Sequence, residues 1–190
     1  KNDLSEDDLM EVIEIQGLLC GAMTTATQRL QHTQGWDQFA DRMMSAYLQV
    51  LSINSSAGVH EEALLAIGAV ADATGVQFQK YMQHLMTPLS AALANHEHYQ
   101  VCAVATAVVG DVCRALGQQI MAYADNIVYL LLEALQSTLL DRTVKPPILS
   151  CFGDIAMAAR GQFEKYLPQV MARMQQAAKS SVAVEVSADD

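Results

Sequence analysis

The sequence has few charged residues, and most of those it has are acidic. Charged residues make up 17% of the 190 residues, and 11 lysines and arginines against 21 aspartates and glutamates give a formal net charge of −10. A surface that binds phosphate backbones needs an excess of lysine and arginine. We therefore expect no direct nucleic-acid partner and consider a basic polypeptide a better match for this charge.

Long apolar runs are also missing. The longest apolar stretch, Ala103 to Val109, is interrupted by Thr106 and is far shorter than the roughly 18 to 20 residues that a membrane-spanning helix needs. We therefore expect no membrane insertion. Hydrophobic residues nevertheless make up 52% of the chain, and the mean hydropathy is +0.16. This composition excludes a disordered chain and predicts a folded domain with a substantial core.

The sequence lacks the residue patterns of a catalytic or metal centre. It has no glycine-rich phosphate loop, no G-x-S-x-G turn and no evident nucleophile–base pair. His96-Glu97-His98 lacks further ligands at metal spacing, so we interpret it as a loop segment. We expect neither an enzyme nor a bound cofactor or metal. The four cysteines have no pairwise spacing typical of a metal or redox site, which favours reduced, buried thiols and a cytosolic or nuclear compartment: Cys20, Cys102, Cys113 and Cys151.

A repeat of 42 to 43 residues runs through the chain. Aromatic and glycine positions both follow this period, at Tyr81, Tyr123 and Tyr166 and at Gly68, Gly110 and Gly153. Within each unit, apolar residues recur every three to four positions, which predicts helices and no strands. Two helices per unit at this period are typical of the HEAT and armadillo class, whose hairpins stack to form one continuous core.

We therefore predict an all-α fold, an α-α superhelix (solenoid) of HEAT repeats with about eight helices in antiparallel hairpins. The expected helices lie near 5–30, 36–52, 60–74, 79–94, 99–116, 120–137, 144–160 and 163–178. We interpret the chain as a single solenoid fragment over 1–190, with repeat units at 1–35 (partial), 36–76, 77–118, 119–161 and 162–190 (partial).

Three segments carry a more specific resemblance. They are Val109-Gly110-Asp111-Val112-Cys113-Arg114-Ala115-Leu116, Val144-Lys145-Pro146-Pro147-Ile148-Leu149-Ser150-Cys151-Phe152-Gly153-Asp154-Ile155-Ala156 and Gly161-Gln162-Phe163-Glu164-Lys165-Tyr166-Leu167. In order and spacing they resemble the middle-to-C-terminal part of the importin-β (karyopherin-β) family of nuclear transport receptors. The resemblance extends from about residue 14 to residue 178.

This resemblance implies a receptor that carries protein cargo through nuclear pores, directly or through the basic segment of the importin-α adaptor. It implies release of cargo when the GTPase Ran binds in its GTP form, mainly at repeats outside this fragment. The expected locations are the cytoplasm, the nucleus and the nuclear envelope at pores. In the family, the first helix of each hairpin lies on the convex side and contacts phenylalanine-glycine (FG) repeats of nucleoporins, and the second helix lies on the concave side.

Four residues are our candidates for binding a basic segment on the concave side. Asp154 points away from the apolar face of its helix, and the equivalent position one unit earlier is Asp111. Arg114 and Asp72 occupy another shared repeat position on the preceding second helices. Stacked carboxylates could pair with lysine or arginine of a partner. The alternative is that these acids are only solvated or form hydrogen bonds between repeats.

Four more residues are our candidates for binding FG repeats on the convex side. Met86 and Val128 share a repeat position, and Tyr129 and Leu132 lie beside them. A groove between neighbouring helices could accept a phenylalanine ring there. Of the four, we expect Tyr129 and Leu132 to be exposed. The alternative is that apolar residues at helical spacing simply form the core.

A second function class also stays open, a HEAT-repeat scaffold that bridges other proteins, as in the structural subunit of a protein phosphatase.

Overall fold

The fold was analysed in a computed structural model that describes residues 5–30, 36–53 and 56–186. The described residues form eight α-helices and no strand. The helices are α1 (Glu6–Leu30), α2 (Trp36–Ser52), α3 (Ala57–Thr74), α4 (Gln79–Leu93), α5 (Tyr99–Leu116), α6 (Ala124–Gln136), α7 (Lys145–Ala159) and α8 (Leu167–Val186). The predicted all-α solenoid is therefore confirmed.

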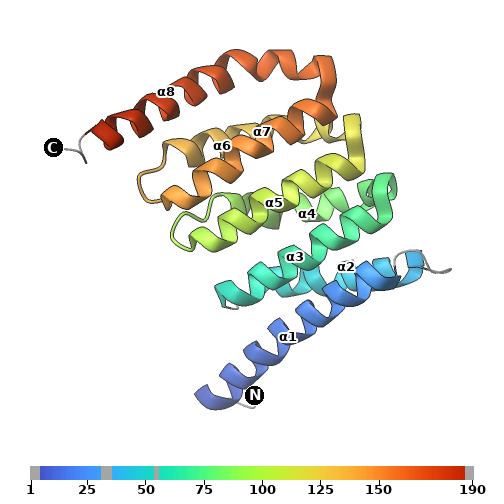
Figure 1. The fold of residues 1–190 in the computed structure, drawn as a ribbon. Helices are drawn as coiled ribbons and strands as arrows, with labels where there is room; N and C mark the ends of the chain where they lie inside the picture. Colours follow the sequence, from blue (N-terminus) through green and yellow to red (C-terminus); the bar gives the residue numbers. More distant parts are fainter. Residues whose placement is uncertain (1–4, 31–35, 54–55, 187–190) are drawn as a thin grey trace.

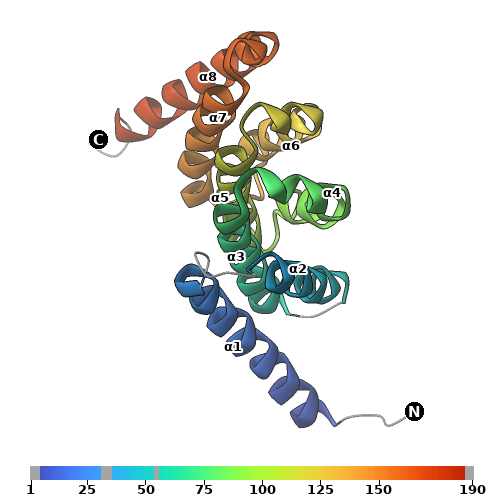
Figure 2. The ribbon, with the colours of Figure 1, turned by 90° about the vertical axis from the view of Figure 1, so that its right-hand side faces the viewer.

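The helices lie in two layers. The first layer holds α2, α4 and α6, which stand on the right of Figure 2, and the second layer holds α3, α5 and α7 beside them. The second-layer helices run side by side up the molecule in Figure 1, from α3 through α5 to α7. The N-terminal helix α1 packs mainly along α3 rather than along α2, so it extends the second layer. The C-terminal helix α8 contacts α6 and extends the first.

The core fills the space between the layers. Each second helix contributes an apolar face, such as Val101, Ala105, Val109 and Val112 of α5, which are at most 2% exposed. The repeated aromatic motif has a packing role, because Phe78 meets Tyr81 edge to face at 5.5 Å, and Phe163 meets Tyr166 in the same way at 5.7 Å. All four cysteines are free and buried, as expected.

The turns after the second helices differ from our expectation. We expected helices to begin near 120 and 163, but α6 begins at Ala124 and α8 at Leu167. Short 3₁₀ segments, η2 (Gly117–Ala122) and η4 (Arg160–Tyr166), precede them. Each starts at a residue with φ near +53°, which reverses the chain sharply after α5 and α7. Glycine adopts this conformation readily at Gly75 and Gly117, whereas Arg160 adopts it with strain.

Among the described residues, two helices are long and apolar enough, by length and composition, to cross a membrane. They cover Asp7–Leu30 and Tyr99–Ala122. The uninterrupted apolar runs that we considered in the sequence did not reveal them, because a helix can be apolar on average without such a run. In the solenoid, 56% of the Tyr99–Ala122 window is buried among neighbouring helices, as in the core helix of a folded domain.

The second-layer helices approach one another very closely at glycines. A Cβ atom added at Gly68 of α3 would lie 2.3 Å from a carboxylate oxygen of Asp111 on α5. A Cβ atom added at Gly110 of α5 would lie 2.8 Å from a carboxylate oxygen of Asp154 on α7. Real Cβ atoms essentially never come this close to a neighbour. The repeated glycine is therefore needed because the acid of the next unit lies directly over it.

We predict that Gly68→Ala destabilises the protein by about 1 kcal/mol, because the new methyl group must displace Asp111. Gly153 is the matched control, since it occupies the same repeat position in α7 and has nothing within 4 Å of its added Cβ. Gly153→Ala should stabilise the helix by about 0.5 to 1 kcal/mol, because glycine is costly inside a helix. Urea unfolding of both variants measures the difference. Equal effects of the two substitutions would show that the Gly68–Asp111 approach is not tight.

Candidate functional site

The four candidate residues of the concave side form one cluster across three second-layer helices. The guanidinium of Arg114 on α5 pairs with Asp111 one turn away and lies 4.0 Å from a carboxylate oxygen of Asp154 on α7. Asp72, near the end of α3, is close enough to influence the titration of Asp111. The structure thus brings together the residues that the repeat pattern selected. We refer to Asp72, Asp111, Arg114 and Asp154 as the acidic cluster.

The electrostatic environment of Asp111 is unusual for a carboxylate. The pKa of Asp111 is raised to about 6, mainly by burial and also by the negative charges of Asp72 and Asp154, while Arg114 acts against them. Its side chain is 23% exposed, compared with 38% for Asp154 and 57% for Arg114. The cluster holds three carboxylates and one guanidinium, which pairs with Asp111 and lies near Asp154, so it has an excess of negative charge that a basic partner could neutralise.

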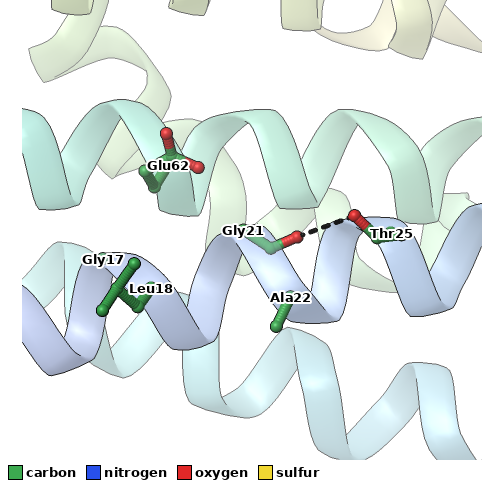
Figure 3. Close-up of a pocket in the computed structure, with 6 residues that line it drawn as sticks. All are labelled: Gly17, Leu18, Gly21, Ala22, Thr25 and Glu62. Atoms are coloured by element: carbon green, nitrogen blue, oxygen red, sulfur yellow. Dashed lines mark hydrogen bonds between the residues drawn. The ribbon is translucent and has the colours of Figure 1, made fainter.

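A shallow pocket lies between α1 and α3. Figure 3 shows small residues of α1 on one side and Glu62 of α3 on the other. A Cβ atom added at Gly21 would lie 3.3 Å from a carboxylate oxygen of Glu62. This arrangement resembles the Gly68–Asp111 contact, because an acid again lies over a glycine of the preceding second-layer helix. We did not single out this pocket from the sequence, although glycines four residues apart at 17 and 21 mark its floor.

The convex candidates do not all lie at the surface. Tyr129 is 60% exposed, as we expected, and Met86 is half-buried. Leu132, however, is only 8% exposed and Val128 only 2%. The expectation that Leu132 is exposed is therefore wrong. The reason is helical geometry, since Val128 and Leu132 are four residues apart and share the inward face of α6, whereas Tyr129 is rotated away from it.

Two clusters between first-layer helices escaped the sequence analysis. The carboxylate of Asp41 on α2 accepts a hydrogen bond from the hydroxyl of Tyr81 at 2.6 Å and pairs with Lys80 at 2.6 Å. The carboxylate of Asp125 on α6 likewise accepts a hydrogen bond from the hydroxyl of Tyr166 at 2.5 Å and pairs with Lys165 at 2.7 Å. In both, the lysine ammonium also lies over the tyrosine ring, at 4.9 and 4.7 Å from its centre. We call these the Asp–Lys–Tyr clusters.

A sequence signal for these clusters exists. The aspartate follows the repeated aromatic position by two residues, and the lysine precedes the tyrosine directly. The repeat of the tyrosines reveals the clusters only when the residues beside each tyrosine are compared between units. The hydrogen bond from each lysine, followed by that from the tyrosine, lowers the pKa of Asp41 and of Asp125 below its ordinary value.

The chain matches a family model over its whole length. The model is described as importin subunit beta-1-like, TPR repeats, and it matches residues 1–190. The chain belongs to the importin subunit beta-1 family. The description of the family names TPR repeats, although the units here are 42 to 43 residues long, compared with 34 in the tetratricopeptide repeat.

Curated members of the family align with nearly the whole chain. Importin subunit beta-1 of Arabidopsis thaliana is 48% identical over 190 residues, which is 98% of this chain and 22% of the plant protein. The Schizosaccharomyces pombe protein of the same name is 41% identical over 92% of this chain and 20% of its own length. The chain therefore spans about a fifth of the length of these relatives.

Solved structures of importin-β share the fold. A crystal structure of importin beta in an ammonium sulfate condition has a TM-score of 0.84 and 40% identity, over 92% of this chain and 20% of that chain. A complex of Kap95 with Nup1 has a TM-score of 0.80 and 26% identity, over 90% of this chain and 20% of that chain. A third structure, of Kap95p with RanGDP, has a TM-score of 0.76 and covers the same shares. The importin-β resemblance seen in the sequence is therefore confirmed.

The raised pKa of Asp111 predicts an unusual dependence of stability on pH. A carboxyl whose pKa is higher in the folded state holds its proton there after the unfolded chain has released it. Its contribution to stability is therefore lost as the pH rises from about 4 to above 6. The quantity to compare is the free energy of unfolding of the parent protein and of Asp111→Asn. The difference, parent minus variant, should fall over this pH range by on the order of 2 kcal/mol.

Urea titrations of both proteins between pH 4 and pH 7.5 measure this difference, and the other acids cancel because both chains contain them. Asp141→Asn is a suitable control, since Asp141 is exposed and its pKa is lowered by hydrogen bonds from Thr143. The difference in the free energy of unfolding between the parent and Asp141→Asn should rise with pH instead. A flat difference for Asp111→Asn would contradict the electrostatic description of the acidic cluster.

Proposed function

We propose that this chain is a section of a nuclear import receptor that carries protein cargo through nuclear pores under the control of Ran. The match of the whole chain to importin subunit beta-1, at 48% identity to a curated member, is the observation that carries this proposal. The solved relatives add support, because they include Kap95 in complex with Nup1 and Kap95p bound to RanGDP. The receptor would act in the cytoplasm, in the nucleus and at the pores of the nuclear envelope. It would contact Ran mainly through repeats outside this chain.

The second-layer helices are the proposed binding face for the basic segment of the importin-α adaptor or for basic cargo. The acidic cluster has three carboxylates and one guanidinium, and Glu62 adds another carboxylate on the same layer. A bound lysine or arginine would be attracted to this excess negative charge, and the partly desolvated position of Asp111 would strengthen the pairing. We therefore propose that Asp72, Asp111 and Asp154 contact the partner and that Arg114 positions their carboxylates.

Asp72→Asn combined with Asp154→Asn should lower the affinity for a basic adaptor peptide severalfold and should make binding less sensitive to salt. These two acids are better targets than Asp111, because both are more exposed, although Asp154 also lies over Gly110. The parent affinity should itself be weak, since the family spreads this contact over many repeats. Calorimetry at two salt concentrations provides the measurement. Glu133→Gln is the control, because Glu133 is an exposed acid on α6 of the other layer. Unchanged affinity in the double variant would contradict the proposed face.

The first-layer helices are the proposed contact for FG repeats of nucleoporins. Tyr129 provides an exposed aromatic ring on α6, and Met171 on α8, the repeat mate of Val128, is 44% exposed. An aromatic ring on the partner could pack against such side chains. Val128 and Leu132 would then support the surface from below and would not form its contact area, whereas the half-buried Met86 would contribute at its edge.

Tyr129→Ser should weaken binding of an FG-repeat peptide without loss of helicity, because it removes an exposed ring and leaves the core intact. Chemical-shift mapping measures both effects. Met157→Ser is the matched control, since Met157 is an apolar side chain that is 82% exposed on the second layer. Leu132→Ser should instead destabilise the fold, because Leu132 is buried. Shift changes confined to α3, α5 and α7 would contradict the proposed FG contact.

Membership of the importin subunit beta-1 family favours the transport function over the scaffold alternative. Both use the same architecture, so the choice depends on the family and not on the fold. We propose no catalytic activity for the chain, because the members that it resembles are named as importins.

A further inference from the structure

One glutamine recurs at the same place in three successive turns of the solenoid. Each turn from a second-layer helix to the next first-layer helix contains a 3₁₀ segment, which is η1 (Gly75–Phe78), η2 or η4. The third residue of each segment is a glutamine, and all three are exposed: Gln77, Gln119 and Gln162. The fourth residue of each segment is apolar and buried. The core therefore accounts for the fourth position and leaves the glutamines unexplained.

The amide groups of these glutamines are not used within the described part of the chain. None of the three side chains forms a hydrogen bond there, although each offers two donors and a carbonyl acceptor. The first two turns also lack charge, since no acidic or basic residue occurs from residue 73 to 79 or from 115 to 124. These turns therefore present neutral hydrogen-bonding groups, in contrast to the acidic cluster.

The three turns lie along one edge of the molecule. In Figure 1, the turns from α3 to α4, from α5 to α6 and from α7 to α8 follow one another along the right-hand side. Neighbouring packed helices are about 8 to 10 Å apart, so equivalent residues of successive units recur at about that distance. We refer to Gln77, Gln119 and Gln162 as the glutamine row.

This spacing matches one regular conformation of an extended chain. A polyproline II helix has three residues per turn and rises about 3.1 Å per residue, so it presents the same side about every 9 Å. Its backbone forms no internal hydrogen bonds, and a glutamine amide can donate to a backbone carbonyl or accept from a backbone N–H group. A β-strand presents the same side about every 6.6 Å instead, which fits the row less well.

The third turn adds a positive charge at one end of the row. Arg160 begins η4 with a φ of +53°, where the other turns have Gly75 and Gly117. Glycine would adopt this conformation without strain, and the core does not require arginine here because Arg160 is exposed. Strained residues of this kind are found preferentially at functional sites. A guanidinium two residues before Gln162 is suited to pair with a carboxylate of a bound segment.

We propose that the glutamine row binds a polyproline II segment of a partner protein through the backbone of that segment, and that Arg160 pairs with an acidic residue at one end of it. The first and third glutamines would contact residues two turns apart, which is about six residues of the segment. The inference does not rest on the proposed import function, because it concerns the turn edge and neither of the two helix layers.

The probe is a synthetic peptide of four Pro-Pro-Ala units followed by one aspartate, which favours polyproline II and leaves one backbone N–H group free in each turn. Titration of the ¹⁵N-labelled parent protein with this peptide should shift the side-chain NH₂ resonances of the glutamine row. A peptide with Gly-Gly-Ala units is the flexible control and should bind more weakly, because it must be ordered on binding. Absence of shifts in the row, or equal binding of the two peptides, would overturn the proposal.

Substitution of the middle glutamine tests the row itself. Gln119→Ala should weaken binding of the Pro-Pro-Ala peptide about fivefold, as expected for loss of a neutral hydrogen bond. Gln118→Ala is the matched control, since Gln118 is exposed in the same turn but its repeat mates are Val76 and Gly161. Circular dichroism should show the parent helicity in both variants. Equal affinity of the two variants would show that the recurring position does not bind the peptide.

Arg160→Gly tests the charged end of the row. A second peptide, with the aspartate before the four Pro-Pro-Ala units, should differ in affinity from the first for the parent protein, because only one of the two places the carboxylate beside Arg160. The variant should bind both peptides equally. It should also resist urea better than the parent, because glycine relieves the strain at this φ. Equal affinity of the two peptides for the parent would contradict the role of Arg160.

Discussion

The close approach of the second-layer helices constrains the rest of the structure. An acid of one unit lies over a glycine of the preceding unit, as Asp111 does over Gly68 and Asp154 over Gly110. A Cβ atom at either glycine would force the carboxylate above it to move, so glycine at this repeat position allows α3, α5 and α7 to pack with these acids in place. The same spacing brings carboxylates of successive units close together, and Arg114 lies between two of them. The charge of the candidate binding face is therefore a consequence of how the repeats pack.

This packing gives the acids unequal roles. Asp111 is the most desolvated of the cluster, lies over Gly68 and has the raised pKa, so part of its contribution is structural. Asp72 is exposed, and Asp154 retains 38% of its side-chain exposure, which leaves both available to a partner. Inter-repeat contact thus dominates at Asp111, exposure to a partner dominates at Asp72, and Asp154 combines the two because it also lies over Gly110. A substitution at Asp111 alone would combine both effects.

The repeat predicted the fold well because each unit must bury one apolar face of each helix, and this face is visible in the spacing of apolar residues. It also selected residues that meet in space, since equivalent positions of a solenoid stack on one another. The repeat did not predict burial correctly where exposure depends on the rotation of about 100° between successive residues of a helix. Leu132 was expected at the surface with Tyr129, but it shares the inward face of α6 with Val128. The 3₁₀ turns before α6 and α8 also escaped, because their apolar residues, Ile120 and Phe163, continue the helical spacing.

Residues that depart from the repeat are informative in this chain. Where all units share a buried residue, as at the aromatic position, it serves the core that every unit needs. Gln83 and Ala122 stand where neighbouring units have the aspartate and lysine of the Asp–Lys–Tyr clusters, and Tyr123 accepts a neutral hydrogen bond from Gln79 instead. Arg160 stands where the other turns have Gly75 and Gly117, with the same positive φ and without the freedom of glycine. In a solenoid each unit contacts only its neighbours. Differences between successive units therefore change the contacts between neighbouring helices, even when the helices themselves are nearly the same.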